Sequence, residues 1–340
     1  MKVPVQPSDV KRILVVKLSS LGDLFHALPA VHNLKAVSGA SIDWLVQPEY
    51  ADLVRCFADV DRVILFPRRG LLSGGRAFLD ELQRDAYDLV VDLQGLLKSA
   101  IPARLARGAL RIGPSFHREG SRLLYDTVAG PRNKERHAVE ENVDVVRRLG
   151  WPELPIEFPV RFPPQPAQGV SPRVVVVPAS RWATKNWPVE GFVEVAEDLL
   201  QRGATVVLVG SAAEQPVCDA IAEKLGPRPN LRNLAGRTSL LELGGLLQLA
   251  QLAITVDSGP MHMAAALGVP VLALFGPTDP VRTGPYGPKA RVLMTQRMPC
   301  QPCFSAACDR HDLACMRRIF PSQVLAAALE MLGARRSGAR

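Results

Sequence analysis

Short apolar runs alternate with helical patterns along the first half of the chain. Four runs predict buried strands, at 13–16, 42–46, 63–65 and 89–93. Helical periodicity predicts helices over 30–37, 50–57, 75–83 and 137–149. Because strands and helices take turns in this order, we expect a parallel sheet that helices cover on both faces.

The second half repeats the alternation after a proline-rich stretch. Seven prolines between 150 and 172 indicate an extended linker and a domain boundary. Beyond it we expect strands at 174–177, 205–209, 233–236, 249–256 and 269–275. Helices are expected over 189–202, 239–249 and 321–332, and a further helix is expected to end at 225. The chain then divides into an N-terminal domain at 1–160, a C-terminal domain at 161–320, and a C-terminal helix with a basic, disordered tail at 321–340.

The fold class that follows is α/β, with two Rossmann-like, doubly wound parallel-sheet domains that face a cleft. In such folds ligands bind where the carboxyl ends of the strands meet. Polar residues that directly follow a predicted strand are therefore the first candidates for a site.

One strand-to-helix turn, Asp257-Ser258-Gly259, predicts an anion site. Gly259 lets the backbone approach a ligand, and the first N–H groups of the following helix attract phosphate. His262 lies one helical turn further on. The alternative is a simple helix cap made by Asp257 or Ser258.

A second turn of this kind follows the first predicted strand, from Lys17 to Asp23. It lacks the three spaced glycines of a dinucleotide fingerprint. Asp23 stands at the start of a helix, where a carboxylate suits the helix dipole. The functional alternative is a carboxylate at the sheet edge that accepts a proton from a hydroxyl group.

The charge narrows the choice of partners. A formal charge of +8 and a pI near 9.4 favour acidic partners: nucleic acid, phosphorylated metabolites or an anionic membrane surface. The basic residues are scattered, mostly in the first half, with few aromatic residues between them, which disfavours nucleic acid. Neither a membrane-spanning apolar run nor a signal-peptide pattern is found, so we expect a cytoplasmic protein.

Four of the six cysteines cluster late in the chain, at Cys300, Cys303, Cys308 and Cys315. In a cytosolic protein such a cluster favours a metal site over disulfides. The spacing is not that of a standard zinc ribbon. Two interpretations therefore stand: a structural zinc or iron ion, or a reduced cysteine-rich loop.

Five motifs in one order resemble the lipopolysaccharide heptosyltransferases, the family 9 glycosyltransferases with the GT-B fold. The motifs, which extend over nearly the whole chain, are Ser19-Ser20-Leu21-Gly22-Asp23, Asp92-Leu93-Gln94-Gly95-Leu96-Leu97-Lys98-Ser99, Lys185-Asn186-Trp187-Pro188, Asp257-Ser258-Gly259-Pro260-Met261-His262 and Phe275-Gly276-Pro277-Thr278-Asp279-Pro280. The second motif, together with Arg118-Glu119 ahead of His137-Ala138-Val139-Glu140, looks more like heptosyltransferase I than II.

The resemblance implies an inverting transfer of heptose from ADP-L-glycero-β-D-manno-heptose to Kdo of Kdo2-lipid A, without a divalent metal. Asp23 matches the family's base. Lys185 would stabilise the leaving ADP together with the helix start at Ser258 and Gly259 and with His262. The remaining donor-binding residues implied are Ser180, Arg181, Glu214 (ribose), Thr238 (adenine) and Asp257. Arg181 stands where the family has a hydroxyl residue, although a guanidinium also suits phosphate.

For the acceptor, the resemblance points to the N-terminal domain. The implied residues are Ser20, Gly22, Lys98 and Arg118, the last within a basic segment at 114–136 that we expect to be a flexible loop. The basic surface also suits docking on the anionic cytoplasmic face of the inner membrane. We expect a monomer that does not bind nucleic acid.

Other functions remain open from the residues. Within the fold, heptosyltransferase II, another family 9 transferase acting on a heptosylated core or other glycan, a UDP-sugar transferase or a sugar-nucleotide epimerase would fit. A non-enzymatic nucleotide-binding module is a further alternative, and a placed carboxylate at the sheet edge argues against it.

Overall fold

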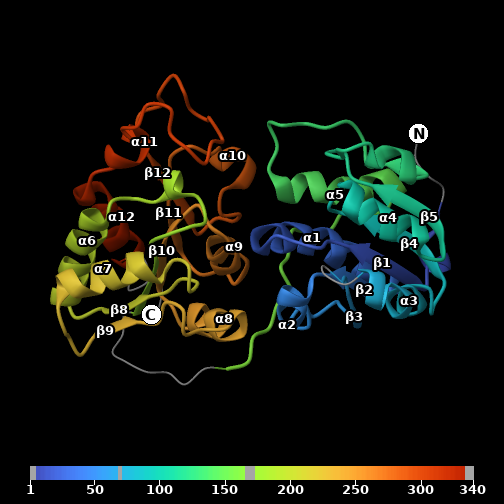
Figure 1. Cartoon of the computed structure of the whole chain (residues 1–340), viewed down its shortest axis with the longest axis horizontal. Helices are drawn as coiled ribbons and strands as arrows, with labels where there is room; N and C mark the ends of the chain where they lie inside the picture. Colours follow the sequence, from blue (N-terminus) through green and yellow to red (C-terminus); the bar gives the residue numbers. More distant parts are fainter. Residues whose placement is uncertain (1–4, 68–70, 165–172, 334–340) are drawn as a thin grey trace. The chain divides into compact units, whose positions relative to one another are not determined.

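The computed structural model describes residues 5–67, 71–164 and 173–333. The chain folds into two compact units, Met1–Arg161 and Phe162–Arg340, each built around its own six-stranded sheet (Figure 1). The last part of the expected linker, 165–172, and the expected disordered tail, 334–340, lie outside the described residues.

The first unit alternates strands and helices as the apolar pattern predicts. Its strands are β1 (Arg12–Val16), β2 (Ser41–Val46), β3 (Arg62–Leu65), β4 (Tyr87–Asp92), β5 (Gly108–Gly113) and β6 (Thr127–Val128). Its α-helices are α1 (Leu21–Ser38), α2 (Ala51–Val54), α3 (Leu71–Leu82), α4 (Leu97–Leu105) and α5 (Ala138–Leu149). Short 3₁₀ turns are η1 (Pro7–Asp9), η2 (Pro48–Tyr50) and η3 (Ser121–Leu124).

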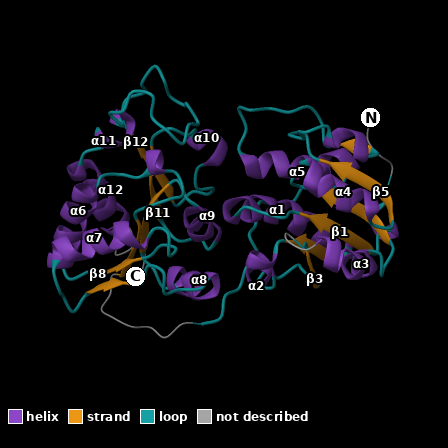
Figure 2. Ribbon diagram, in the orientation of Figure 1, coloured by secondary structure: helices purple, strands orange, loops and turns teal. Residues whose placement is uncertain are grey.

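All neighbouring strands of the first sheet are parallel, in the order β3-β2-β1-β4-β5-β6. The register places Val15 between Trp44 of β2 and Val91 of β4. The central strand is buried along Ile13–Val16, as expected where helices cover both faces of a parallel sheet. Figure 2 shows helices on both sides of the strands.

The second unit repeats this plan. Its strands are β7 (Arg173–Val177), β8 (Thr205–Leu208), β9 (Leu231–Asn233), β10 (Leu252–Val256), β11 (Val271–Phe275) and β12 (Ala290–Met294). Its helices are η4 (Ala183–Lys185), α6 (Val189–Gln201), α7 (Gln215–Leu225), α8 (Leu240–Gln248), α9 (Gly259–Ala266), α10 (Pro280–Thr283), α11 (Ala314–Arg317) and α12 (Pro321–Gly333). The strands are again all parallel, in the order β12-β11-β10-β7-β8-β9. Read from β9 to β12, this order corresponds strand for strand to that of the first sheet.

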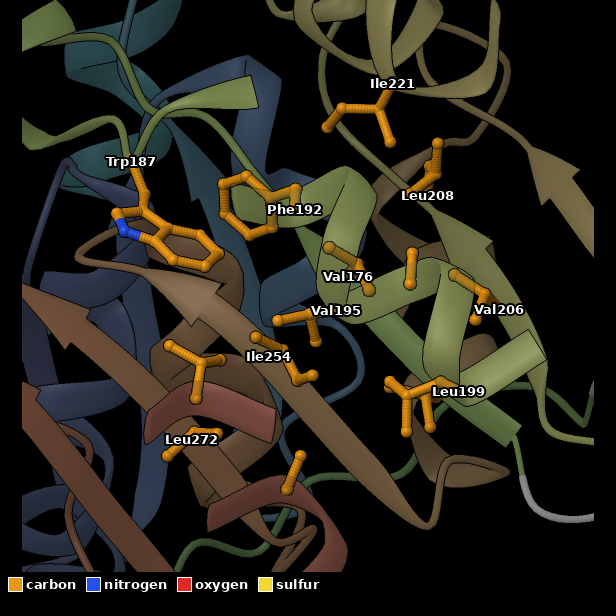
Figure 3. Close-up of a cluster of buried hydrophobic side chains, with 14 of the residues drawn as sticks. Val176, Trp187, Phe192, Val195, Leu199, Val206, Leu208, Ile221, Ile254 and Leu272 are labelled. Atoms are coloured by element: carbon orange, nitrogen blue, oxygen red, sulfur yellow. The ribbon is translucent and has the colours of Figure 1, made fainter. Parts of the chain in front are cut away.

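A buried apolar cluster joins helices to the second sheet (Figure 3). Trp187 packs edge-on against Phe192 with ring centroids 4.9 Å apart, and its indole N–H donates to the carbonyl of Ile319 at 3.0 Å. Trp187 is therefore a core residue of the second unit. Helix α12 packs on α6 and on β10, so the helical part of the predicted C-terminal segment belongs to the second unit.

Several sequence predictions were wrong in detail. The elements β5, β6, β12, α4, α10 and α11 were not predicted. The helix predicted to start near Asp23 and the helix predicted at 30–37 are one continuous helix, α1, which Ser20 and Asp23 cap at its start. The segment 114–136, expected to be a loop, contains η3 and β6.

A helix that crosses a bilayer needs about 20 consecutive, mostly apolar residues. Within 5–67, 71–164 and 173–333, no helix is long and apolar enough to cross a membrane.

Candidate active site

The candidate residues follow the two central strands of each sheet, where successive strands stop being added on one side and continue on the other. This change of side lies between β1 and β4 in the first unit and between β7 and β10 in the second. Asp23 follows β1, Lys185 follows β7, and Asp257 directly follows β10. Ligands of doubly wound sheets bind at this kind of position.

Three side chains from separate turns meet in the second unit. Lys185 Nζ lies 2.8 Å from Asp257 Oδ2, and Thr278 Oγ1 donates to the same carboxylate oxygen at 2.7 Å. The Asp257 side chain is 8% exposed and that of Lys185 is 19% exposed. The Lys185 ammonium also lies 4.8 Å from the centroid of the Trp182 ring. These contacts hold the positively charged Lys185 ammonium at the edge of the sheet. Thr278 lies in one of the five sequence motifs but was not predicted from the sequence as a site residue.

The start of α9 lies in the same turn as Asp257. Ser258 is the N-cap residue by its extended backbone, yet its side chain makes no capping hydrogen bond. Its hydroxyl oxygen is buried and has no hydrogen-bond partner among the described residues. Gly259 opens the helix, and His262 is buried one turn on. Unused backbone donors at a helix start, beside the Lys185 cation, form a site suited to an anion.

The other donor-side residues lie on turns after neighbouring strands. Ser180 follows β7, where its N–H donates to Asn186 Oδ1 at 2.9 Å, and Arg181 beside it is exposed. Glu214 precedes α7 and accepts from the N–H of Ser211 at 2.7 Å. Thr238 precedes the α8 cap, which is Ser239. Within the described residues, no hydrogen bond or ion pair joins any of these four residues to Lys185.

Asp23 caps the helix that carries it. Its Oδ2 accepts from the N–H of Ser20 at 3.0 Å and from the Ser20 hydroxyl at 2.7 Å. Its side chain is 44% exposed, and Oδ1 lies 3.9 Å from Nδ1 of the buried His26. The His26 ring in turn packs edge-on against His137, with centroids 5.4 Å apart. The capping and the catalytic interpretations are compatible, because capping engages Oδ2 and a solvent-facing carboxylate remains.

A neighbouring strand end holds the Asp23 turn in place. Gln94 Oε1 accepts from the N–H groups of Leu18 and Ser19, each at 3.2 Å. Asp92 fixes Gln94 in turn, because its Oδ1 accepts from the Gln94 N–H at 2.7 Å. Tyr125 donates to Asp92 Oδ2 at 2.6 Å. The sequence showed these residues inside a motif but did not reveal this support.

Two buried charges lie at this edge. Lys17 Nζ donates to the carbonyl of Leu93 at 2.6 Å, and burial lowers the pKa of Lys17, against the attraction of Asp23 and Asp92. Burial likewise raises the pKa of Asp92 above its ordinary value, opposed by the hydrogen bond from Tyr125.

The four residues expected to bind the acceptor belong to the first unit. Ser20 contacts Asp23 as described, and Gly22 is buried in the first turn of α1. Lys98 on α4 and Arg118 before η3 are both exposed. The N–H of Arg118 donates to the carbonyl of Gly95 at 2.8 Å, which attaches its loop to the turn before α4.

The four clustered cysteines line one cavity of the second unit, together with Thr184 and Pro277. Within the described part of the chain, no group of three or more His, Cys, Asp or Glu residues is placed to hold a metal ion. The structure thus lends the expected zinc or iron no support, and such an ion stays a prediction.

The segment that carries these cysteines braces the donor turns. Thr184 Oγ1 donates to the carbonyl of Ser305 at 2.8 Å, and Gln301 Nε2 donates to the carbonyl of Gly276 at 2.7 Å. The cysteine segment is thus attached to the turns that carry Lys185 and Thr278.

Two Rossmann-like units, with the Lys185 ammonium and the start of α9 at the strand ends of the second sheet and the capped carboxylate of Asp23 at those of the first, match the GT-B fold of the heptosyltransferases. The fold is similar to that of Escherichia coli heptosyltransferase WaaC with ADP, at a TM-score of 0.77 and 28% identity over 94% of this chain and 99% of that one. The predicted fold class and enzyme class are confirmed.

The model of glycosyltransferase family 9 (heptosyltransferase) matches residues 76–313, and the chain belongs to this family. It is 34% identical to lipopolysaccharide heptosyltransferase 1 of Pseudomonas aeruginosa, over 91% of this chain and 90% of the relative. It is 30% identical to lipopolysaccharide heptosyltransferase 1 of Escherichia coli (strain K12), over 84% of this chain and 94% of the relative. These relatives support heptosyl transfer in lipopolysaccharide synthesis.

Proposed function

We propose that the protein transfers L-glycero-D-manno-heptose from ADP-L-glycero-β-D-manno-heptose to Kdo of Kdo2-lipid A, with inversion at the anomeric carbon. The observation that carries the proposal is the Lys185–Asp257–Thr278 cluster beside the start of α9, which suits a diphosphate leaving group. The similarity to a heptosyltransferase solved with ADP supports the same donor.

On the acceptor side, Asp23 is the proposed base. Its carboxylate takes the proton of the Kdo hydroxyl as that oxygen attacks the anomeric carbon, and the bond from this carbon to the ADP oxygen breaks. The Ser20 hydrogen bonds hold the carboxylate at the helix start, and the half-exposed side chain leaves it accessible to an acceptor.

On the donor side, the leaving ADP gains negative charge as the bond breaks. Lys185 and the N–H groups that open α9 at Ser258 and Gly259 stabilise this charge, and His262 adds a donor on the same helix. Asp257 orients Lys185 through their 2.8 Å ion pair. Because this positive charge comes from the protein, we propose that transfer needs no divalent metal.

The remaining roles follow from position and chemistry. Ser180 and Arg181 bind the diphosphate, Glu214 binds the ribose hydroxyls, and Thr238 lies against the adenine. These assignments rest on their places after β7, after β8 and before α8.

The acceptor is acidic, with Kdo carboxylates and lipid A phosphates, and Lys98, Arg118, Ser20 and Gly22 form its proposed site. We propose that the protein works as a monomer on the cytoplasmic face of the inner membrane and does not bind nucleic acid.

A transfer assay with purified protein tests the proposal. ADP-heptose and Kdo2-lipid A are incubated with and without EDTA, and the product is weighed by mass spectrometry. A product one heptose heavier, in equal amount with EDTA, is expected. Product only with an already heptosylated acceptor would move the assignment to heptosyltransferase II, and no product with either acceptor would refute the donor.

A further inference from the structure

Helix α4 carries an apolar stripe on its solvent side. Leu97, Ile101 and Leu105 are spaced four residues apart, so they share one face of the helix. Their exposed fractions are 42%, 46% and 43%. The opposite face of α4 packs into the unit through small side chains such as Ala100 and Ala103. The outer face of a surface helix is ordinarily polar, so this stripe calls for an explanation.

The neighbouring turn η3 carries a further exposed apolar side chain. It packs against α4, and the Ser121 hydroxyl donates to the carbonyl of Gly95, just before that helix, at 3.0 Å. Leu123 in η3 is 87% exposed, more than any other large apolar side chain in the described ranges. We call Leu97, Ile101, Leu105 and Leu123, with the exposed basic residues around them, the α4–η3 surface.

Helix α4, the turn η3 and the segments next to them also carry exposed basic residues. They are Lys98, Arg104, Arg107, Arg118 and Arg122. No described acidic side chain pairs with Lys98, Arg104 or Arg118 in the residues that the structure covers.

The two acidic residues nearby are already engaged with the protein. Glu119 accepts from the N–H of Leu97 at 3.0 Å, and Asp126 accepts from the N–H of Arg111 at 2.8 Å. The five exposed basic residues outnumber the carboxylates of Glu119 and Asp126, so the α4–η3 surface has a net positive charge.

We propose that the α4–η3 surface docks the protein on an anionic lipid bilayer. The apolar side chains enter the boundary between headgroups and acyl chains, and the basic side chains contact lipid phosphates. A symmetric contact between two copies would bring the basic residues of both together without compensation, which disfavours self-association. A nucleic acid could bind the arginines through its phosphates, but it would leave the apolar stripe exposed to water.

The inference deepens the proposed function, on which it rests for its purpose. Lys98 and Arg118, the proposed acceptor residues, belong to the α4–η3 surface, so docking would bring a membrane-embedded acceptor to the unit that carries Asp23. Docking itself requires no transfer and can be measured alone.

Vesicle co-sedimentation of the full chain tests the proposal. Vesicles of equal parts phosphatidylcholine and phosphatidylglycerol are compared with vesicles of phosphatidylcholine alone. We expect binding to the first and little to the second, weakened by added salt because exposed charges are screened. Ile101→Ser with Leu123→Ser should weaken binding at least about tenfold, since two apolar side chains no longer enter the lipid.

A matched control separates this surface from general apolar exposure. Phe320 lies in the second unit and is 57% exposed, so Phe320→Ser should leave vesicle binding unchanged. Arg104→Glu with Arg122→Glu should weaken binding to the anionic vesicles and reduce its salt dependence.

Activity on an O-deacylated, water-soluble acceptor separates the two claims. The Ile101→Ser, Leu123→Ser protein should transfer to it at the wild-type rate while failing to bind vesicles. Vesicle binding without transfer by the wild type would refute the proposed function alone. Equal vesicle binding by the wild type and both double variants would overturn the docking surface. It would also be overturned if the wild type did not bind vesicles but formed a concentration-dependent dimer that Leu123→Ser abolished.

Discussion

Replacing Asp23 with asparagine separates its two roles, capping α1 and accepting the acceptor proton. The asparagine side chain has nearly the same shape and keeps one oxygen that can accept from the Ser20 N–H, now 3.0 Å from Asp23 Oδ2. It loses the negative charge and with it the ability to take a proton. The substitution therefore tests the base with little change in structure.

The two effects differ enough in size to be told apart. Loss of the charge at the helix start costs about 0.3–1 kcal/mol of stability, since the dipole interaction is lost while a cap acceptor remains. Loss of a general base costs about 10²–10⁴-fold in kcat, which is about 2.7–5.4 kcal/mol in the barrier. Transfer should collapse in a protein that is almost as stable as the wild type.

The assay combines kcat for heptose transfer, ADP binding by calorimetry and urea unfolding. ADP affinity should be unchanged, because the donor cluster around Lys185 lies in the other unit. Glu242→Gln is the matched control. Glu242 has the same place in the α8 capping box, where its Oε2 accepts from the N–H and the hydroxyl of Ser239 at 2.7 and 2.9 Å.

Glu242→Gln should lower the urea unfolding midpoint about as much as Asp23→Asn does and leave kcat at the wild-type level. A folded Asp23→Asn protein with kcat within about threefold of wild type would show that another group takes the proton, since the loss expected of a base is at least about 10²-fold.

Three further predictions concern the support of the site. Lys185→Met should lower kcat about 10²-fold and weaken ADP binding, because the cation beside the leaving group is lost. Adding Asp257→Asn neutralises the carboxylate that has lost its ion-pair partner, so it should recover stability in urea unfolding but not kcat. Recovery of kcat in the double variant would contradict the role of Lys185. Tyr125→Phe should destabilise the protein by about 1–3 kcal/mol in urea unfolding, because it removes the 2.6 Å hydrogen bond to the buried Asp92, and an unchanged midpoint would show that this bond contributes nothing. Hydrogen bonds from backbone N–H groups, with that of Leu313 the largest contribution, lower the pKa of Cys308, whereas burial raises the pKa of Cys218 to about 12. Because the thiolate is the reactive form, iodoacetamide at neutral pH should label Cys308 well before Cys218 in peptide mass mapping. The reverse order of labelling would refute this prediction.

The strands that the sequence predicted well are those covered on both faces. Strands β7 and β10 are buried at every position, and apart from Arg173 at the start of β7 and Thr255 in β10 their residues are apolar. Strands β5 and β12 are only partly buried; glycine and arginine residues interrupt the apolar residues of β5, and β12 has only a three-residue apolar run at its end. Helix α4 was missed because Pro102 lies inside it and its apolar residues lie partly on the outer face, so helical periodicity does not stand out.

The sequence by itself determined the fold class, the family resemblance and the turns that hold Asp23, Lys185 and Asp257. Apolar periodicity and the small residues after each strand depend on local geometry, which neighbouring residues specify. Only the tertiary structure decided which side chains meet at those turns.

Thr278 reaches Asp257 across 21 residues, and Gln94 reaches Ser19 across 75. These contacts depend on strand order and register. Both are set by the burial of the whole sheet between its helices, so no single stretch of residues encodes them.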